Sequence, residues 1–297
     1  MVKLTRTVTE ADAGRKIKYF VRGEMQVSYR QFSALKMYDG LSVNGNVVHA
    51  NYIIQPGDVV CVLLEDAPRT AVIPEDGPVN IVYEDDDIFI IDKTAPLSCQ
   101  ASSKHPEGTL ENRVAGRFRH VEGFVFRPLN RLDKGTSGLM CAAKHAHACQ
   151  ILQKQLHTPD FLREYLAVAE GTLTGSGTLD YPMSKVDDAT IRRFVDFENG
   201  RRAVTHYTVD ENHEGYSLVR LRLETGRTHQ IRVHLSHIGH PIAGDFLYGN
   251  EDARLPERFA LHSTRIRLVH PITSEVIDIT SPLPPDLRAV LEGGVKP

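Results

Sequence analysis

The sequence lacks any apolar run long enough to cross a membrane, and its first residues are charged instead of apolar. A secretory signal needs an apolar core, so we expect neither a signal nor a membrane anchor in this chain of 297 residues. Only four cysteines are present, and no two of them form a CxxC pair. This pattern argues against a disulfide framework and predicts reduced thiols, which are typical of a cytoplasmic protein.

A large excess of either charge is also missing. The formal net charge is −3, with 41% hydrophobic and 25% charged residues, which is an ordinary globular composition. Overall charge therefore gives no sign of a nucleic-acid partner. Residues 1–65 hold eight Lys and Arg against six Asp and Glu, so this first segment is the mildly basic part of the chain.

Turn and capping signals divide the chain into a short part and a long part. The short part has a helix pattern preceded by Ser28, which suits an N-cap, and a hairpin turn signal at the NG pair that begins with Asn44. Residues 66–78 hold three prolines and a glycine and are typical of a linker. We therefore predict a small α+β module with its linker in residues 1–72, and a larger domain in residues 73–297.

The larger part mixes strand and helix patterns without regular βαβ spacing. Two apolar strands flank the acidic turn 84–87, which we interpret as a solvated hairpin tip. An apolar run at 138–144 suits a buried strand, and residues 145–156 suit a helix. Several alternating strands follow. This arrangement predicts an α+β fold with a largely antiparallel sheet.

The first informative motif is NRLDKGTSGL, residues 130–139. It gathers charged, hydroxyl and glycine residues directly before an apolar run, which predicts a turn that presents a side chain. Asp133 in this turn could be a cap, half of a structural ion pair, or a nucleophile. On this motif alone, the ion pair or the cap is the usual interpretation.

The second motif is ETGRTHQIRVHLSHIGHPIAGDFLYG, residues 224–249. Thr228 suits an N-cap and Gly239 suits the position after a helix end, so we predict a helix between them. Arg227 then precedes the helix N-terminus, where its charge and the helix dipole favour an anion. Four histidines lie in this motif, but their spacing matches no familiar set of metal ligands, and we expect no metal.

Together and in this order, the two motifs resemble those of the RluA-type family of RNA pseudouridine synthases. The resemblance extends from IVYEDDDIFIIDK, which begins at residue 81, through REYLAVAEG to LHSTRIRLVHPITSE. It implies a pseudouridine synthase fold and the isomerisation of specific uridines in structured RNA, with no cofactor. Residues 15–65 resemble a small RNA-binding module of the ribosomal-protein type. The implied partner is RNA, with large-subunit ribosomal RNA expected and tRNA as the alternative, and we expect a monomer.

The resemblance also assigns roles to residues of this sequence. It makes Asp133 the catalytic carboxylate, with Arg227 as its counter-charge. Tyr165 would contact the target base, by stacking or by proton abstraction. A uridine must leave its helix to reach a buried carboxylate, so base flipping is implied. Arg131 would fill the gap left by the flipped base.

Two further residues complete the expected site. Thr136 would fix the turn through backbone hydrogen bonds, together with its neighbour Ser137, and we place it with the RNA-binding residues. His229, in the second motif, is expected to bind RNA as well.

Two other classes of function stay open at this point. An RNA-binding protein on an inactive scaffold would have lost Asp133, Tyr165 or Arg227, and all three are present. A hydrolytic glycosidase would need a second carboxylate, which Asp245 could supply. The reaction product, free uracil or pseudouridine, distinguishes a glycosidase from a synthase.

Overall fold

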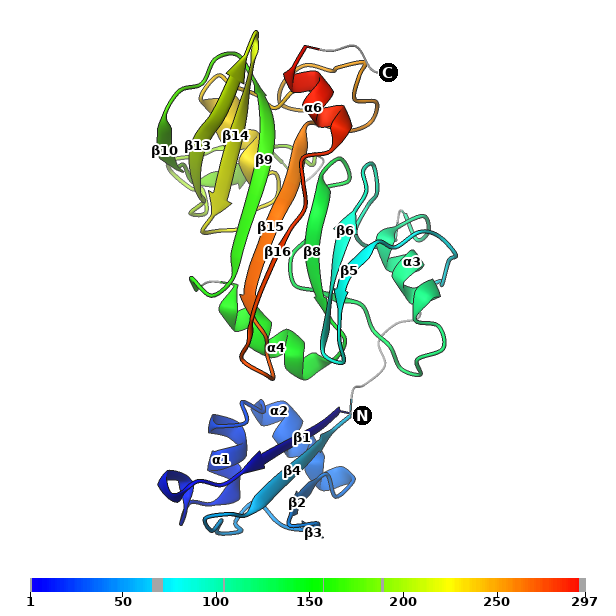
Figure 1. Ribbon diagram of the computed structural model, residues 1–297, viewed down its shortest axis with the longest axis vertical. Coiled ribbons are helices and arrows are strands. Elements are labelled where there is room, and N and C mark those ends of the chain that lie inside the picture. The colour runs from blue at the N-terminus through cyan, green and yellow to red at the C-terminus, as the bar shows by residue number, and fades with distance from the viewer. Residues whose placement is uncertain (1, 66–71, 104, 157, 188–189, 294–297) are drawn as a thin grey trace.

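The computed structural model describes residues 2–65, 72–103, 105–156, 158–187 and 190–293. Two sheets organise this part of the chain, a small one near the N-terminus and a large one that extends through the rest (Figure 1). The fold is α+β, and the only parallel pair among the described strands joins β15 to β8. The expected α+β fold with a largely antiparallel sheet is therefore confirmed.

The first sheet has its own core. Its strand order is β1-β4-β2-β3. Helices α1 and α2 bury residues such as Phe20 and Phe32 in a cluster made only of residues 4–64. Ser28 caps α2, as the sequence predicted, and also forms a reciprocal capping box with Gln31. The elements are β1 (Val2–Thr7), a 3₁₀ turn (Glu10–Asp12), α1 (Ile17–Gly23), α2 (Tyr29–Ala34), a second 3₁₀ turn (Leu35–Met37), β2 (Leu41–Val43), β3 (Asn46–Val47) and β4 (Val59–Leu64).

The second sheet has the order β10-β13-β14-β9-β15-β8-β6-β5, with β16 on β15 and β7 on β8. Its strands are β5 (Ile81–Glu84), β6 (Ile88–Lys93), β7 (Arg127–Pro128), β8 (Ser137–Ala143), β9 (Leu162–Glu170), β10 (Ser176–Asp180), β13 (Val204–His213), β14 (Tyr216–Leu223), β15 (Leu261–Val269) and β16 (Val276–Thr280). A separate pair is formed by β11 (Met183–Lys185) and β12 (Arg193–Val195). The strand expected at 138–144 is present as β8.

Helices cover both faces of this sheet because its central strands are apolar on both sides. On β6, Phe89 and Ile91 pack in one cluster, and Ile88 and Ile90 pack in another. The first cluster includes residues of α3 (Leu110–Arg117), α5 (Gln230–His237) and α6 (Pro285–Leu291). The second includes residues of α4 (Ala146–Gln155), the helix expected at 145–156. The sheet is therefore a buried central layer.

The predicted linker lies partly outside the described residues, which omit 66–71. Residues 72–80 form no helix or strand. They are nonetheless attached to the larger part, because the Asn112 side chain donates to the Ile73 carbonyl at 2.9 Å and the Asn112 carbonyl accepts from Glu75 N at 3.0 Å. Across the described ranges, no helix combines the length and apolarity that a membrane span requires.

Candidate active site

A cavity of about 1810 Å³ brings together all six residues singled out from the sequence. Arg131, Asp133 and Thr136 line it from the turn before β8, and Tyr165 lines it from β9. The segment that leads into α5 contributes the other two, Arg227 and His229. Three segments far apart in the sequence thus meet at one hollow.

Close packing explains the composition of the turn that carries Asp133. Thr136 N donates to the Asp133 carbonyl at 3.1 Å and closes the turn. A Cβ at Gly135 would lie 2.7 Å from the Phe259 ring. Gly138 has φ +103°, and a Cβ there would lie 2.3 Å from a carbonyl of β15. The turn can therefore pack this closely against Phe259 and β15 only with glycine at both positions.

The hydroxyl of Ser137 acts differently from expectation. Ser137 Oγ contacts His262 Nδ1 at 2.9 Å and accepts from Arg258 Nη2 at 2.9 Å, so its partners are side chains and not backbone groups. Arg258 in turn pairs with Asp286 at the start of α6. Thr136 is buried, with 2% of its surface exposed. The turn is thus held from behind by α6 and β15.

The counter-charge of Asp133 is Arg232 and not Arg227. Arg232 Nη1 lies 3.1 Å from Asp133 Oδ2. Arg227 lines the same cavity but is exposed, and its Nε donates to the Arg202 carbonyl at 3.1 Å. The position of the helix explains this difference: Arg227 precedes α5, whereas Arg232 lies on its first turn and faces the turn before β8.

Arg232 is held rigidly by a second carboxylate and two aromatic rings. Its Nε and Nη2 donate to the two oxygens of Asp245 at 2.7 and 2.8 Å. Its guanidinium lies 4.1 Å from the Phe259 ring centroid and 5.0 Å from that of Tyr248. Burial lowers the pKa of Arg232, but Asp245 and Asp133 outweigh it and raise the pKa above its usual value. The Arg232 guanidinium is therefore permanently charged, and its Nη1 lies against Asp133.

The position of Asp245 weakens the glycosidase alternative. Asp245 is fully buried, both of its oxygens bind Arg232, and Oδ1 also accepts from the backbone of Leu247 and Tyr248. It lies behind Arg232 and is not free to act as a second acid or base. Sequence reasoning missed the central role of Arg232, although a charged residue between Ile231 and Val233 on an apolar helix was a usable signal.

His229, and not Thr228, is the N-cap of α5. It has a left-handed backbone with φ 59° and makes no capping hydrogen bond with its side chain. Its Nδ1 contacts the Tyr248 hydroxyl at 2.8 Å, and its Nε2 lies 3.8 Å from Asp133 Oδ2. Burial lowers the pKa of His229, so it is neutral at neutral pH. Its contact with Asp133 is therefore not an ion pair under these conditions.

Tyr165 lies on β9 with 5% of its surface exposed and faces the cavity. Burial raises its pKa, and the nearby charge of Arg163 opposes this effect only in part. Tyr165 is thus a neutral phenol at neutral pH and a weak base.

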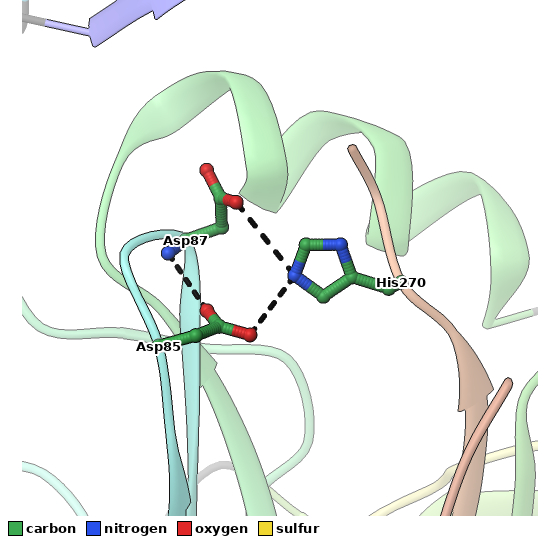
Figure 2. A group of neighbouring side chains, drawn as sticks. All are labelled: Asp85, Asp87 and His270. Carbon is green, nitrogen blue, oxygen red and sulfur yellow. Dashed lines mark hydrogen bonds and ion pairs between the residues drawn. The ribbon is translucent and has the colours of Figure 1, made fainter. Parts of the chain in front are cut away.

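The acidic turn between β5 and β6 is more than a solvated tip, because its carboxylates face His270 (Figure 2). His270 Nε2 lies 3.0 Å from Asp85 Oδ2 and 3.7 Å from Asp87 Oδ2. One ligand atom from each of these three residues lies within 4.8 Å of the others, a spacing that could suit a metal. However, His270 Nδ1 accepts two backbone N–H groups, from Ile272 and Thr273. With Nδ1 accepting, Nε2 carries the proton and faces the two carboxylates, and we call this polar contact the clamp.

This clamp lies far from Asp133 along the sheet. Ile88, next to the acidic turn, pairs with Ala143, whereas Lys93 at the other end of β6 pairs with Gly138. The turn with Asp133 precedes Gly138, so the clamp and the cavity turn lie at opposite ends of the β6–β8 pair.

Comparisons with known proteins indicate the family of this chain. A family model described as RNA pseudouridylate synthase matches residues 87–237. The RNA pseudouridine synthase YhcT of Bacillus subtilis (strain 168) is 41% identical over 252 residues, which cover 84% of this chain and 83% of that protein. Ribosomal large subunit pseudouridine synthase D of Escherichia coli (strain K12) is 35% identical over 98% of this chain and 94% of its own. The solved structure of human RNA Pseudouridylate Synthase Domain Containing 1 has a TM-score of 0.56 at 26% identity, covering 70% of this chain and 86% of that one.

The fold and these matches define an RNA-modifying isomerase. The chain belongs to the RNA pseudouridine synthase family of RluA type.

Proposed function

We propose that this synthase isomerises specific uridines of large-subunit ribosomal RNA, with Asp133 as the nucleophile. The choice of RNA is supported by relatives named for the ribosomal large subunit, one of which aligns with 98% of this chain. tRNA is the alternative substrate. We propose that the protein acts on RNA in the cytoplasm. We also propose that it acts as a monomer.

The observation that carries the mechanism is the pairing of Asp133 with Arg232 at the cavity wall. The Asp133 side chain is 28% exposed, so one oxygen can bind Arg232 while the group still reaches the cavity. Pseudouridine forms when the bond from C1′ to N1 breaks, a bond from C1′ to C5 forms, and a proton passes from C5 to N1. Atoms and electrons balance without a redox cofactor. The step needs a fixed anion beside the sugar and base, and Asp133 supplies it.

Base flipping accounts for the other residues that line the cavity. A uridine stacked in a helix cannot reach a recessed carboxylate, so the nucleotide must turn out of its helix. Tyr165 offers its buried ring to the uracil. Arg131 is exposed two residues before Asp133 and is suited to fill the gap in the RNA, while Thr136 and His229 support the bound nucleotide.

The small N-terminal module is suited to bind RNA. On its helices, Lys18 lies 5.0 Å from the ring centroid of Tyr19, and Arg22 lies 5.3 Å from that of Tyr29. Tyr19 is 55% exposed and Tyr29 is 69% exposed. Exposed aromatic rings next to cations can stack on bases and contact phosphates. Arg30 of this module also lines the cavity of the larger domain, so one RNA could reach both.

The test is the product formed by Asp133→Asn on ribosomal RNA from cells that lack the protein. We expect pseudouridine formation to fall below detection while RNA binding persists, because the change keeps the shape of the side chain and removes its charge. Asp278→Asn, which alters an exposed carboxylate paired with Arg265, is the matched control and should keep wild-type turnover. Retained turnover in Asp133→Asn would refute the nucleophile. Free uracil in place of pseudouridine would refute the isomerase reaction.

A further inference from the structure

We propose that Arg163 forms an anion subsite that binds a backbone phosphate of the RNA beside the flipped uridine. This inference rests on the proposed function for the identity of the ligand. It adds a residue to which neither sequence motif pointed, and a specific chemistry for one wall of the cavity.

Strand geometry directs Arg163 into the cavity. Arg163 and Tyr165 are two residues apart on β9, so their side chains leave the same face of the sheet. Both line the cavity that also holds Asp133. A Cβ at Gly226 would lie 3.1 Å from Arg163 Nη1, so the guanidinium lies against the backbone just before Arg227.

Arg163 is buried, and no described residue supplies its counter-charge. Only 8% of its surface is exposed, and its Nε is buried with no hydrogen-bond partner. Within the described ranges, its guanidinium makes no hydrogen bond or ion pair. Two other arginines with similar burial have carboxylates: Arg232 binds Asp133 and Asp245, and Arg258 binds Asp286. A buried cation without a partner is costly, so the free protein lacks an anion at this position that a ligand could supply.

The charges around this wall select an anion. Seven arginines line the cavity, and Arg131, Arg163, Arg227 and Arg232 are among them. Only two carboxylates among the described residues line it, Glu111 and Asp133, and Arg232 already binds Asp133. Uridine itself is neutral and cannot supply the missing charge. A phosphodiester can, and its oxygens fit the planar fork of a guanidinium.

The first experiment measures thermal stability with and without inorganic phosphate. Arg163→Met removes an unpaired buried charge, so we expect the variant to melt at a higher temperature than the wild type in phosphate-free buffer. Added phosphate should raise the Tm of the wild type more than that of the variant, because a ligand stabilises only a protein that binds it. Arg267→Met, at an exposed position of β15 outside the cavity, is the control and should keep the full phosphate response.

The second experiment measures ribosomal RNA affinity against salt concentration, with Asp133→Asn in every protein so that no turnover occurs. Arg163→Met should reduce the slope of log affinity against log salt by about one, the effect of one lost phosphate contact. Arg163→Lys should restore most of that slope but not the full affinity, since a point charge lacks the two-pronged geometry.

The outcomes separate this inference from the proposed function. Destabilisation or misfolding of Arg163→Met, or a phosphate response and salt slope equal to those of Arg267→Met, would show a structural role and overturn the subsite. A phosphate response that depends on Arg163, in a protein that makes no pseudouridine in any RNA, would refute the proposed reaction and leave the anion subsite standing. A phosphate response with no change in the RNA salt slope would limit the site to free phosphate and refute the RNA contact.

Discussion

At the residue scale, Arg232 joins the buried carboxylate of Asp245 to the carboxylate of Asp133 at the cavity wall. Asp245 and the rings of Phe259 and Tyr248 fix its guanidinium, and the remaining edge positions Asp133. Under the proposed mechanism, we therefore expect stability and catalysis to depend on the same side chain. Arg227, which the sequence suggested for this role, is exposed, and its Nε donates to the Arg202 carbonyl.

We therefore expect Arg232→Ala and Arg227→Ala to differ sharply in urea denaturation. Arg232→Ala leaves Asp245 buried and unpaired, which should lower the free energy of unfolding by about 3–5 kcal/mol. Arg227→Ala removes an exposed side chain and should change it by less than about 0.5 kcal/mol. Turnover should be lost in Arg232→Ala, and Arg232→Lys should recover only part of it. Equal unfolding free energies in the two alanine variants would contradict the arrangement of this site.

At the element scale, the β5–β6 hairpin is attached to the end of β15 by its acidic tip. Asp85 accepts from the Tyr83 hydroxyl at 2.6 Å and from the backbone N–H groups of Asp87 and Ile88 at 2.8 Å each. Burial raises the pKa of Asp85, but these hydrogen bonds and His270 outweigh it and lower the pKa below its usual value. The hydrogen bond to Asp85 also raises the pKa of Tyr83 to about 12. The clamp therefore requires an ionised Asp85.

This clamp should make stability depend on pH in the acid range. A carboxyl group whose pKa is lower in the folded state stabilises the fold at pH values above its unfolded pKa of about 3.9. That stabilisation is lost as the pH falls through the folded-state pKa. Asp85→Asn should therefore melt lower than the wild type at pH 7, and the difference should shrink at pH 3. Asp86→Asn, in the same turn but exposed, is the control for the loss of one charge. A pH-independent difference for Asp85→Asn would exclude the ionised clamp.

At the scale of the whole molecule, the two sheets have separate cores. The first core contains only residues 4–64, and the large sheet begins at β5. Residues 73–75 are bound to α3, so a cut after residue 72 leaves these contacts intact. Helix α4 contacts the small module, because Gln150 Nε2 donates to the Gln26 carbonyl at 3.1 Å.

Deletion of residues 1–72 should therefore leave a catalytic domain that unfolds cooperatively but binds ribosomal RNA more weakly. The salt dependence of its affinity should also flatten, by about one unit of slope for each phosphate contact that the module makes. A salt titration of both proteins, with a thermal melt of each, measures these effects. Identical affinities at every salt concentration would exclude an RNA-binding module, and an unfolded truncation would place the boundary elsewhere.

The sequence by itself determined the features that depend on local patterns. Capping signals such as Ser28, glycine turns such as Asn44-Gly45, and apolar periodicity predicted the helices, hairpins and buried strands, because these depend on residues close together in the chain. The motif around Asp133 and the second motif predicted which segments form the cavity. Only the tertiary structure decided which charges meet there. Arg232 faces Asp133 because of the phase of α5, and Arg163 is buried without a carboxylate partner among the described residues because β9 turns it into the cavity. Electrostatic pairing depends on distances of a few ångströms between segments about a hundred residues apart, and no local pattern encodes those distances.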